Sequence, residues 1–424
     1  MRPSIYLTLV FAFFSQISLA QLSGSYTVGG DSPDFASIQE AVDAVMTDGV
    51  SGPVQIRLRP GTYEPANPDE LVFSIPDTIP GASTTNRVTI EPDKSVGATV
   101  ENVIVRITDG TPSFAGASIA EVRASYVTIR EITFENADTT SSGILPALVT
   151  MSVVRQETPP TGNTVEGCRF VGRTSTTTTI AGIGVYGLNA DILIDRNEFS
   201  GAYHGVHFSS PSIRPRVSAN TITGLAGIEP TNSPNNGAIV LNGGSVDALV
   251  HENLIDFRSS GGVYGINLIN AESFTITANR VVGFPAGGGL PLWDFFAAIE
   301  VFNSNAAARA AGGMIANNMV AGTYAGSRNG IRVWGDNVSV LHNSVHHPPR
   351  GIGCNSQREA GIWLQTGSGR DVRNNVVLDE TNACLNSAAL VIDDTTGNFF
   401  DSNNLIGPEV GAVFANGTQY LTVE

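Results

Sequence analysis

The sequence predicts an all-β protein: a single-domain right-handed parallel β-helix of about ten or more coils, with a capping α-helix at its N-terminal end. Two observations carry this prediction. A pattern of an apolar residue, two residues, an asparagine, one residue and a second apolar residue recurs at intervals of 23 to 39 residues. Short segments of alternating polarity precede most copies at a similar distance. Such recurrence is typical of a solenoid, in which each coil packs only on its neighbours.

The asparagine of the repeat is expected to face the inside of a turn, as in Val250-x-x-Asn253-x-Ile255. A side-chain amide is both donor and acceptor, so stacked copies can bond to one another and to the turn backbone. Two earlier copies carry Ile132 and Cys168 instead. We interpret the row as a structural ladder rather than as a set of ligands, because a buried polar row is stable only when every member is bonded. The ladder positions are Asn197, Asn220, Asn253, Asn279, Asn318, Asn343, Asn375 and Asn403.

The alternating segments are expected to be strands. Ile299-Glu300-Val301, Ile331-Arg332-Val333 and Ile362-Trp363-Leu364 are examples, and segments of this kind begin 12 to 19 residues before the asparagine. A period of two with one apolar face indicates a strand. Strands at a similar phase, separated by loops of variable length, can stack in parallel when each coil advances about 4.8 Å. The predicted fold is therefore a parallel β-helix.

The N-terminal segment 34–46 differs from the repeats and is expected to be the capping helix. Val42 and Val45 lie on one apolar helical face, and Ser37 or Asp34 is available as an N-cap. An amphipathic helix across the open end of the first coil would cover its apolar edge.

Residues 1–20 have the charged start, the short apolar run and the small residues of a secretory signal, with cleavage after Ala20. We expect the protein to be secreted or held at the cell surface, with residues 21–424 forming one β-helix domain whose repeats span about 100–415. No other stretch approaches the roughly 18 uninterrupted apolar residues of a membrane span.

Composition restricts the partners. The chain has 39 acidic and 23 basic residues and a formal net charge of −16, without a basic stripe, so we expect no nucleic-acid partner. Its three cysteines permit one disulfide at most. Cys354 and Cys384 are about one coil apart, and both a disulfide between them and two free thiols are consistent with this spacing. The sequence indicates no oligomeric state.

The segment Pro33 to Ala44, followed by Pro60-Gly61-Thr62-Tyr63, resembles the opening of the pectin-lyase-like superfamily, particularly pectinesterase-type chains and exported bacterial β-helix proteins. The resemblance continues through the repeats and implies the fold. It does not imply a reaction, because the superfamily includes lyases, glycoside hydrolases, pectinesterases, tailspikes and adhesins. Asp393-Asp394 and His204-Gly205 resemble parts of a hydrolase signature in reversed order, and Cys168 begins a pectinesterase-like motif that lacks its acid.

The predicted strands place a candidate site on their outer face. Their central residues point outward and stack coil upon coil, so Glu300, Arg332 and Trp363 are expected at successive steps of about 4.8 Å. Trp334 and Phe302 belong to the neighbouring row. Aromatic faces stack on sugar rings, while carboxylates and guanidinium groups bind hydroxyls or uronates. We therefore expect a groove that binds a polysaccharide or a surface glycan.

Long insertions flank this patch, and the one at 284–296 contains Trp293 and Asp294. Glu300 or Asp294 would act as acid or base and Arg332 as the neutralising partner, for a lyase or a glycoside hydrolase. Alternatively, Glu300 and Arg332 form an ordinary cross-strand ion pair without a functional role. The alternative class of protein is a non-catalytic adhesin or extracellular structural protein. No metal ligand set is evident, but Ca²⁺ at Asp393-Asp394 is kept as a cofactor hypothesis. The expected sugar-contacting side chains are Trp334, Trp363, His207, Asn267, Phe302 and Trp293.

Overall fold

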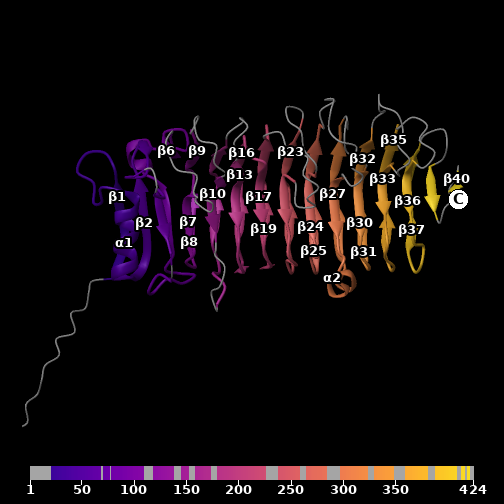
Figure 1. Cartoon of the computed structure of the whole chain (residues 1–424), viewed down its shortest axis with the longest axis horizontal. Helices are drawn as coiled ribbons and strands as arrows, with labels where there is room; N and C mark the ends of the chain where they lie inside the picture. The colour runs from indigo at the N-terminus through magenta and orange to yellow at the C-terminus, as the bar shows by residue number, and fades with distance from the viewer. Residues whose placement is uncertain are drawn as a thin grey trace, which may run out of the picture.

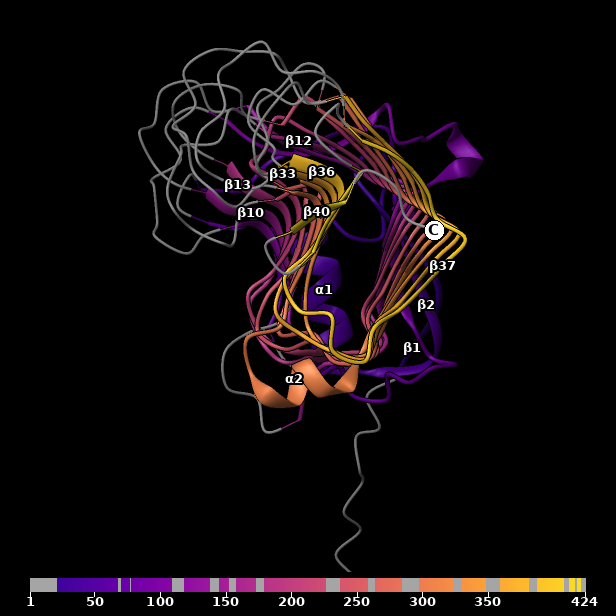
Figure 2. The same ribbon diagram turned by 90° about the vertical axis from the view of Figure 1, so that its right-hand side faces the viewer.

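The computed structural model describes residues 21–67, 70–76, 78–108, 118–137, 145–151, 158–172, 179–225, 237–257, 264–283, 297–322, 329–347, 359–380, 387–407, 412–415 and 418–420. Three long sheets run side by side along the molecule, and viewed along its length they form the walls of a prism (Figures 1 and 2). We call them sheets A, B and C. This arrangement confirms the predicted right-handed parallel β-helix.

Sheet A contains 13 strands, all of them parallel to their neighbours. Its strands begin N-terminal to the repeats recognisable in the sequence, so stacking starts with the first residues that the structure describes. They are β1 (Leu22–Val28), β2 (Val50–Leu58), β5 (Val88–Pro92), β8 (Val127–Arg130), β11 (Thr164–Glu166), β15 (Leu193–Asp195), β19 (Arg216–Ser218), β22 (Leu249–His251), β25 (Phe274–Thr277), β28 (Gly313–Ala316), β31 (Val338–Leu341), β34 (Asp371–Arg373) and β37 (Phe399–Asp401).

Sheet B contains 12 parallel strands. They are β3 (Gly61–Tyr63), β6 (Val103–Ile107), β9 (Thr133–Asn136), β12 (Arg169–Val171), β16 (Glu198–Ser200), β20 (Thr221–Thr223), β23 (Leu254–Asp256), β26 (Arg280–Val282), β29 (Met319–Ala321), β32 (Ser344–His347), β35 (Val376–Asp379) and β38 (Asn404–Ile406).

Sheet C contains 13 strands and includes the alternating segments recognised in the sequence. Its last strand is antiparallel to the one before it. The strands are β4 (Phe73–Ile75), β7 (Ser118–Val122), β10 (Leu145–Met151), β13 (Thr179–Val185), β17 (His204–Phe208), β21 (Ile239–Leu241), β24 (Ile266–Ile269), β27 (Ala297–Phe302), β30 (Asn329–Trp334), β33 (Glu359–Leu364), β36 (Ser387–Ile392), β39 (Val413–Ala415) and β40 (Thr418–Tyr420).

The remaining elements are short. β14 (Asn189–Ala190) and β18 (Ser212–Ile213) pair between sheets C and A. A 3₁₀ turn, η1, spans Lys94–Val96, and a second helix, α2 (Ala306–Ala311), begins after its N-cap Asn305.

The capping helix is α1 (Ile38–Asp48), which lies across the N-terminal end of the prism in Figure 2. Ser37 is its N-cap and accepts a hydrogen bond from the backbone N–H of Glu40, as this residue type does at helix starts. Asp34 is not part of the helix, because its carboxylate accepts hydrogen bonds from the backbone and hydroxyl of Thr27 on β1. The apolar side chains Val42 and Val45 are buried in the core, so the helix covers the first coil.

The eight asparagines lie in one row through the turn between sheets A and B. Asn253, for example, donates its side-chain amide to Asn279 Oδ1 at 2.9 Å and to the carbonyl oxygen of Val217 at 2.9 Å. The same bonds repeat from Asn197 to Asn403. The residue before each asparagine has a positive φ, as at Glu252 (54°). The amides therefore bind the backbone of a turn that uses an unfavourable left-handed conformation in every coil.

Sheet C bends inward at one position, and this bend decides which side chains reach its outer face. An added Cβ on Gly330 would lie 2.4 Å from Val345 Cγ1 of sheet B, so Gly330 faces the core together with the next residue, Ile331. Residues one position before the glycine consequently face outward. Ala360 and Ala388 pack there with Trp363 and Val391 in an apolar cluster separate from the main core.

Candidate functional site

The outer face of sheet C has the register that the sequence predicts. Strand pairing aligns His207 with Val240, Val240 with Asn267, Asn267 with Glu300, Glu300 with Arg332 and Arg332 with Trp363. In the next row, Phe302 pairs with Trp334. The stacked order of these side chains is thus confirmed.

The sequence predicts that these side chains line a groove on the outside of the sheet, but those at its centre are buried. The side chains of Arg332 and Glu300 are only 2% and 4% exposed, and Asn267 is buried as well. These residues point away from the solenoid core and are nevertheless withdrawn from solvent. The centre is therefore a buried polar cluster, which we call the Glu300 cluster: Tyr264, Asn267, Glu300, Arg332, Trp363, Gln365 and Asp393.

An ion pair forms the middle of the Glu300 cluster. Arg332 Nη1 donates to Glu300 Oε1 at 2.8 Å. The other side of the guanidinium group donates through Nε and Nη2 to Gln365 Oε1, at 3.0 and 2.6 Å. The hydroxyl of Tyr264 donates a hydrogen bond to the Glu300 carboxylate. Every charge in the cluster thus has a partner, as burial of an ion pair requires.

Burial changes the acid–base properties of these groups. It raises the pKa of Glu300 above its ordinary value, although Arg332 and the Tyr264 hydroxyl both oppose the change. The pKa of Tyr264 is also raised, first by burial and then by the nearby Glu300 carboxylate. Glu300 is therefore easier to protonate than an exposed glutamate, which is a property of catalytic carboxylic acids.

Aromatic rings enclose the ion pair. The guanidinium carbon of Arg332 lies 5.0 Å from the ring centroid of Trp363, within the range of a cation–π contact. Trp363 Nε1 donates to Asp393 Oδ2 at 3.1 Å. In the adjacent row, Phe302 and Trp334 meet edge to face at 4.7 Å. Trp334 Nε1 is buried and has no hydrogen-bond partner among the residues that the structure describes.

His207 lies on the same face but apart from the Glu300 cluster. Its ring stacks on that of His204, with centroids 4.8 Å apart. Three strand steps of about 4.8 Å separate His207 from Glu300.

The sequence did not indicate Tyr264, which strict alternation before Ile266 would have placed inside. The bend at Gly265 reverses this: an added Cβ there would lie 2.8 Å from the core atom Val281 Cγ1. The available signal for such a bend was a glycine or alanine directly before the alternating segment. Glycines stand at this position in other coils as well, namely Gly205, Gly330 and Gly361. Gln365, two residues after Trp363, was not assigned to the site either.

Several sequence predictions fall outside the described residues: Trp293, Asp294, Cys354, Cys384 and the segment 1–20. Cys168 is buried, and burial raises its pKa to about 12.

The two aspartates considered for calcium point to different partners. Asp393 binds the Trp363 indole, whereas Asp394 Oδ1 accepts from the backbone N–H of Thr396 at 2.9 Å. In the described part of the chain, no three or more histidine, cysteine, aspartate or glutamate side chains are grouped to hold a metal ion. Within the same residues, no helix has the length and apolarity needed to cross a membrane.

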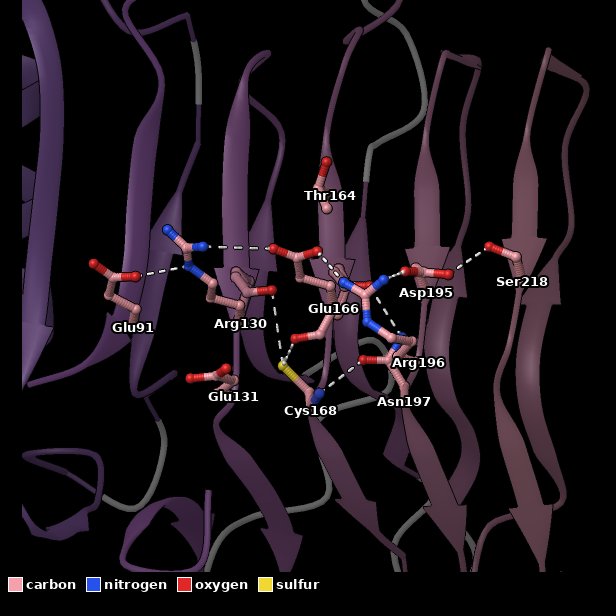
Figure 3. Close-up of polar contacts among 12 residues, drawn as sticks. Glu91, Arg130, Glu131, Thr164, Glu166, Cys168, Asp195, Arg196, Asn197 and Ser218 are labelled. Carbon is pink, nitrogen blue, oxygen red and sulfur yellow. Dashed lines mark hydrogen bonds and ion pairs between the residues drawn. The ribbon is translucent and has the colours of Figure 1, made fainter. Parts of the chain in front are cut away.

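A second concentration of charges lies on the outer face of sheet A (Figure 3). Arg130 Nε lies 2.7 Å from Glu91 Oε2, Arg196 Nη2 lies 2.9 Å from Glu166 Oε2, and Ser218 Oγ donates to Asp195 Oδ1 at 2.6 Å. The arginine side chains are 36% and 64% exposed. This network has no aromatic member, so we interpret it as a solvated surface network.

The three sheets define the protein as a right-handed parallel β-helix, the fold that the sequence predicts. No protein-family model and no curated protein matches the sequence. Among solved structures, the A-module of a mannuronan C-5 epimerase from Azotobacter vinelandii has 13% identity and a TM-score of 0.46, covering 91% of this chain and 94% of its own.

Two further solved structures are similar to this chain. The Agl-KA catalytic domain has 15% identity and a TM-score of 0.48, covering 94% of this chain and 68% of its own. An alginate lyase from a Paenibacillus species has 13% identity and a TM-score of 0.37, covering 90% of this chain and 98% of its own.

Proposed function

We propose that this protein binds a polysaccharide on the outer face of sheet C, with the Glu300 cluster at the centre of the site. One observation carries the proposal: the ion pair of Glu300 and Arg332 lies outside the solenoid core and is still almost completely buried. Apolar residues of similar volume would stabilise such a position as well or better. Packing alone therefore gives no reason for the charges, whereas a binding or catalytic site does.

The chemistry of the cluster suits a sugar. The indole rings of Trp363 and Trp334 are apolar surfaces of the kind that stack on a pyranose ring, and Trp334 Nε1, which has no partner among the described residues, offers a donor to a hydroxyl group. Asn267, Gln365 and Glu300 add polar groups at neighbouring steps of the sheet. A mostly apolar site with a few placed polar groups is typical of ligand pockets.

For catalysis, a lyase fits this geometry better than a glycoside hydrolase. A hydrolase needs two carboxylates, about 6.5–9.5 Å apart when it inverts and closer when it retains. The nearest other carboxylate among the described cluster residues, that of Asp393, is three strands from Glu300, or about 14 Å. A lyase needs one base and one neutralising cation, and Glu300 and Arg332 supply these roles.

The alternative is a non-catalytic adhesin or extracellular structural protein that uses the same solenoid. The observation in its favour is that Arg332 already has Glu300 and Gln365 as partners. A guanidinium group held by partners within the protein contributes shape and polarity to a binding site without having to change its protonation.

We also propose that residues 1–20 direct export and are removed after Ala20. The support is the sequence pattern of a charged start, an apolar run and a small-residue cleavage position. The N-terminal sequence of protein recovered from the culture medium tests this, and an intact Met1 on that protein would refute it.

Screening against immobilised polyuronates and neutral glycans tests the binding function, and release of reducing ends or of unsaturated products separates hydrolase, lyase and non-catalytic binder. Trp363→Ala is expected to weaken binding at least tenfold, on the order of 1.4 kcal/mol. The matched control is Phe399→Ala on sheet A, whose ring also lies near a guanidinium group, 5.6 Å from that of Arg373. Equal affinity of both variants and the native protein would refute the proposal.

A further inference from the structure

We propose that Tyr186, His204 and His207 form a second ligand subsite on the outer face of sheet C, which takes an uncharged ring bearing hydroxyl groups, such as a neutral pyranose. We call it the His207 subsite. It extends the proposed polysaccharide-binding function and rests on it, but different residues carry it. Three strand steps of about 4.8 Å separate His207 from Glu300, so the two sets of side chains are about 14 Å apart along the sheet.

The absence of a side chain at Gly184 leaves room for the Tyr186 ring of this subsite. Gly184 pairs with His207 in the outward row. A Cβ on Gly184 would lie 2.5 Å from Cε2, 2.6 Å from Cζ and 2.7 Å from the hydroxyl oxygen of Tyr186. The Tyr186 ring therefore lies directly over the backbone of Gly184, where a larger residue would displace it.

Two stacked imidazoles continue the surface. The rings of His204 and His207 are 4.8 Å apart with an interplanar angle of 25°, and Tyr186 meets His207 edge-on at 6.2 Å. His204 Nδ1 lies 2.6 Å from the carbonyl oxygen of Gly237, to which it donates when protonated, and 3.3 Å from the backbone nitrogen of Gly237, whose N–H it accepts in the other tautomer. In either tautomer the Gly237 backbone holds the orientation of the His204 ring.

His207 supplies the unused hydrogen-bonding groups. Both its ring nitrogens are withdrawn from solvent, and neither has a partner among the residues that the structure describes. A buried polar atom without a partner costs about 1–3 kcal/mol. A neutral imidazole has one donor and one acceptor, so a ligand hydroxyl, which is both, could satisfy either nitrogen.

The subsite carries no net charge. Burial lowers the pKa of His204 to about 4 and of His207 to about 3, so both rings are neutral near pH 7. Burial raises the pKa of Tyr186 to about 12, so its phenol is also neutral. Thr150 and Val240 occupy the flanking positions of the same row. Among these residues an anionic sugar finds no cation and a cationic ligand no carboxylate, which leaves an uncharged ring.

The test compares binding of neutral hexaoses (cello-, manno-, xylo- and malto-) and of hexauronates to the full-length protein by calorimetry. Gly184→Ala, which displaces the Tyr186 ring, and His207→Phe, which removes the nitrogens, are each expected to weaken binding of a neutral hexaose about tenfold. The controls are Gly61→Ala, where the added Cβ meets only Arg59 O at 4.0 Å, and His251→Phe on sheet A, and both are expected to bind normally.

The outcomes separate this inference from the proposed function. Native affinity for neutral hexaoses in both His207-subsite variants, or no neutral hexaose bound by the native protein, overturns the inference. Binding of hexauronates that is still lost in Trp363→Ala leaves the proposed function standing in either case. Stoichiometric Zn²⁺ binding that disappears in His207→Phe also overturns the inference, because the histidines would then be metal ligands. The inference is supported when neutral-hexaose binding is lost in Gly184→Ala and His207→Phe and kept in the two control variants.

Discussion

The outer faces of sheets A and C carry ion pairs of almost the same length that differ in exposure, chiefly at the arginine. On sheet A, Arg130 and Glu91 meet at 2.7 Å with side chains 36% and 11% exposed. On sheet C, Arg332 and Glu300 meet at 2.8 Å with side chains 2% and 4% exposed. The distance alone does not separate a surface ion pair from a candidate site. Burial does, because it determines what the charges cost and how strongly their pKa values change.

The surroundings differ in the same sense. The sheet A network consists of arginine, carboxylate and hydroxyl groups (Figure 3). The sheet C face adds Trp363 against the guanidinium group of Arg332 and the Phe302–Trp334 pair. One scaffold with one strand spacing therefore carries a solvated face and an aromatic, buried face.

The largest expected effect is that of removing one partner of the buried pair. Glu300→Ala leaves the Arg332 guanidinium group buried without its anion, which is expected to lower the free energy of unfolding by about 3–5 kcal/mol. Glu91→Ala, the matched change on sheet A, is expected to cost less, because the Arg130 side chain that it leaves behind is 36% exposed to water. Urea denaturation of both variants measures this, and similar losses would remove the distinction between the two faces.

The histidines of sheet C are expected to make stability depend on acid. Their pKa values in the folded protein, about 4 for His204 and about 3 for His207, are below the ordinary value of 6.5. Between pH 6.5 and these folded-state pKa values, the unfolded chain therefore binds more protons than the folded one. The free energy of unfolding falls as the pH drops below about 6.5, and each histidine contributes about 1.4 kcal/mol for every unit by which its pKa is lowered on folding. His207→Phe should flatten the dependence of the urea midpoint on pH between 6.5 and 4. An unaltered slope in His207→Phe would contradict this prediction.

A third change tests the interior frame that both faces share. Asn279→Ala removes the Oδ1 that accepts from the backbone N–H and the side-chain amide of Asn253, at 3.0 and 2.9 Å. The orphaned donors are expected to cost about 1–3 kcal/mol. Asn317→Gly, which keeps a residue suited to the left-handed position of the next turn, is the control. Thermal unfolding of the two variants measures the difference, and equal midpoints would show that the ladder contributes no stability.

The smallest expected effect is on sheet A. Glu166→Gln weakens the contact with Arg196, which is 2.9 Å in the native protein, and is expected to change stability by less than about 1 kcal/mol, with a difference that shrinks as salt is added. Polysaccharide binding should be unaffected. A loss of binding in this variant would move the functional face from sheet C to sheet A.

Much of the stacking of side chains along sheet C could be predicted, because it depends on the position of each residue within its coil and not on the length of the loops between strands. The row from His207 to Trp363 follows from strands that alternate in polarity and return once in each coil. The glycine directly before Ile266 was the available signal for the bend at Gly265, and because the alternation was followed strictly, Tyr264 was missed. The hydrogen bond from Trp363 to Asp393 was missed as well, because two strands must be stacked before an indole and a carboxylate 30 residues apart can meet. None of the eight left-handed residues before the ladder asparagines, such as Glu252 and His342, is a glycine, and they gave no signal.

The sequence by itself determined the solenoid, the inward asparagines and the order of side chains along sheet C, because periodicity fixes which residues face the same way and which repeat meets the next. Only the tertiary structure decided that Glu300 and Arg332 are buried, that Tyr264 joins them and that His204 stacks on His207. Burial and pKa depend on everything that surrounds a group in space, and a local pattern of residues does not contain that information.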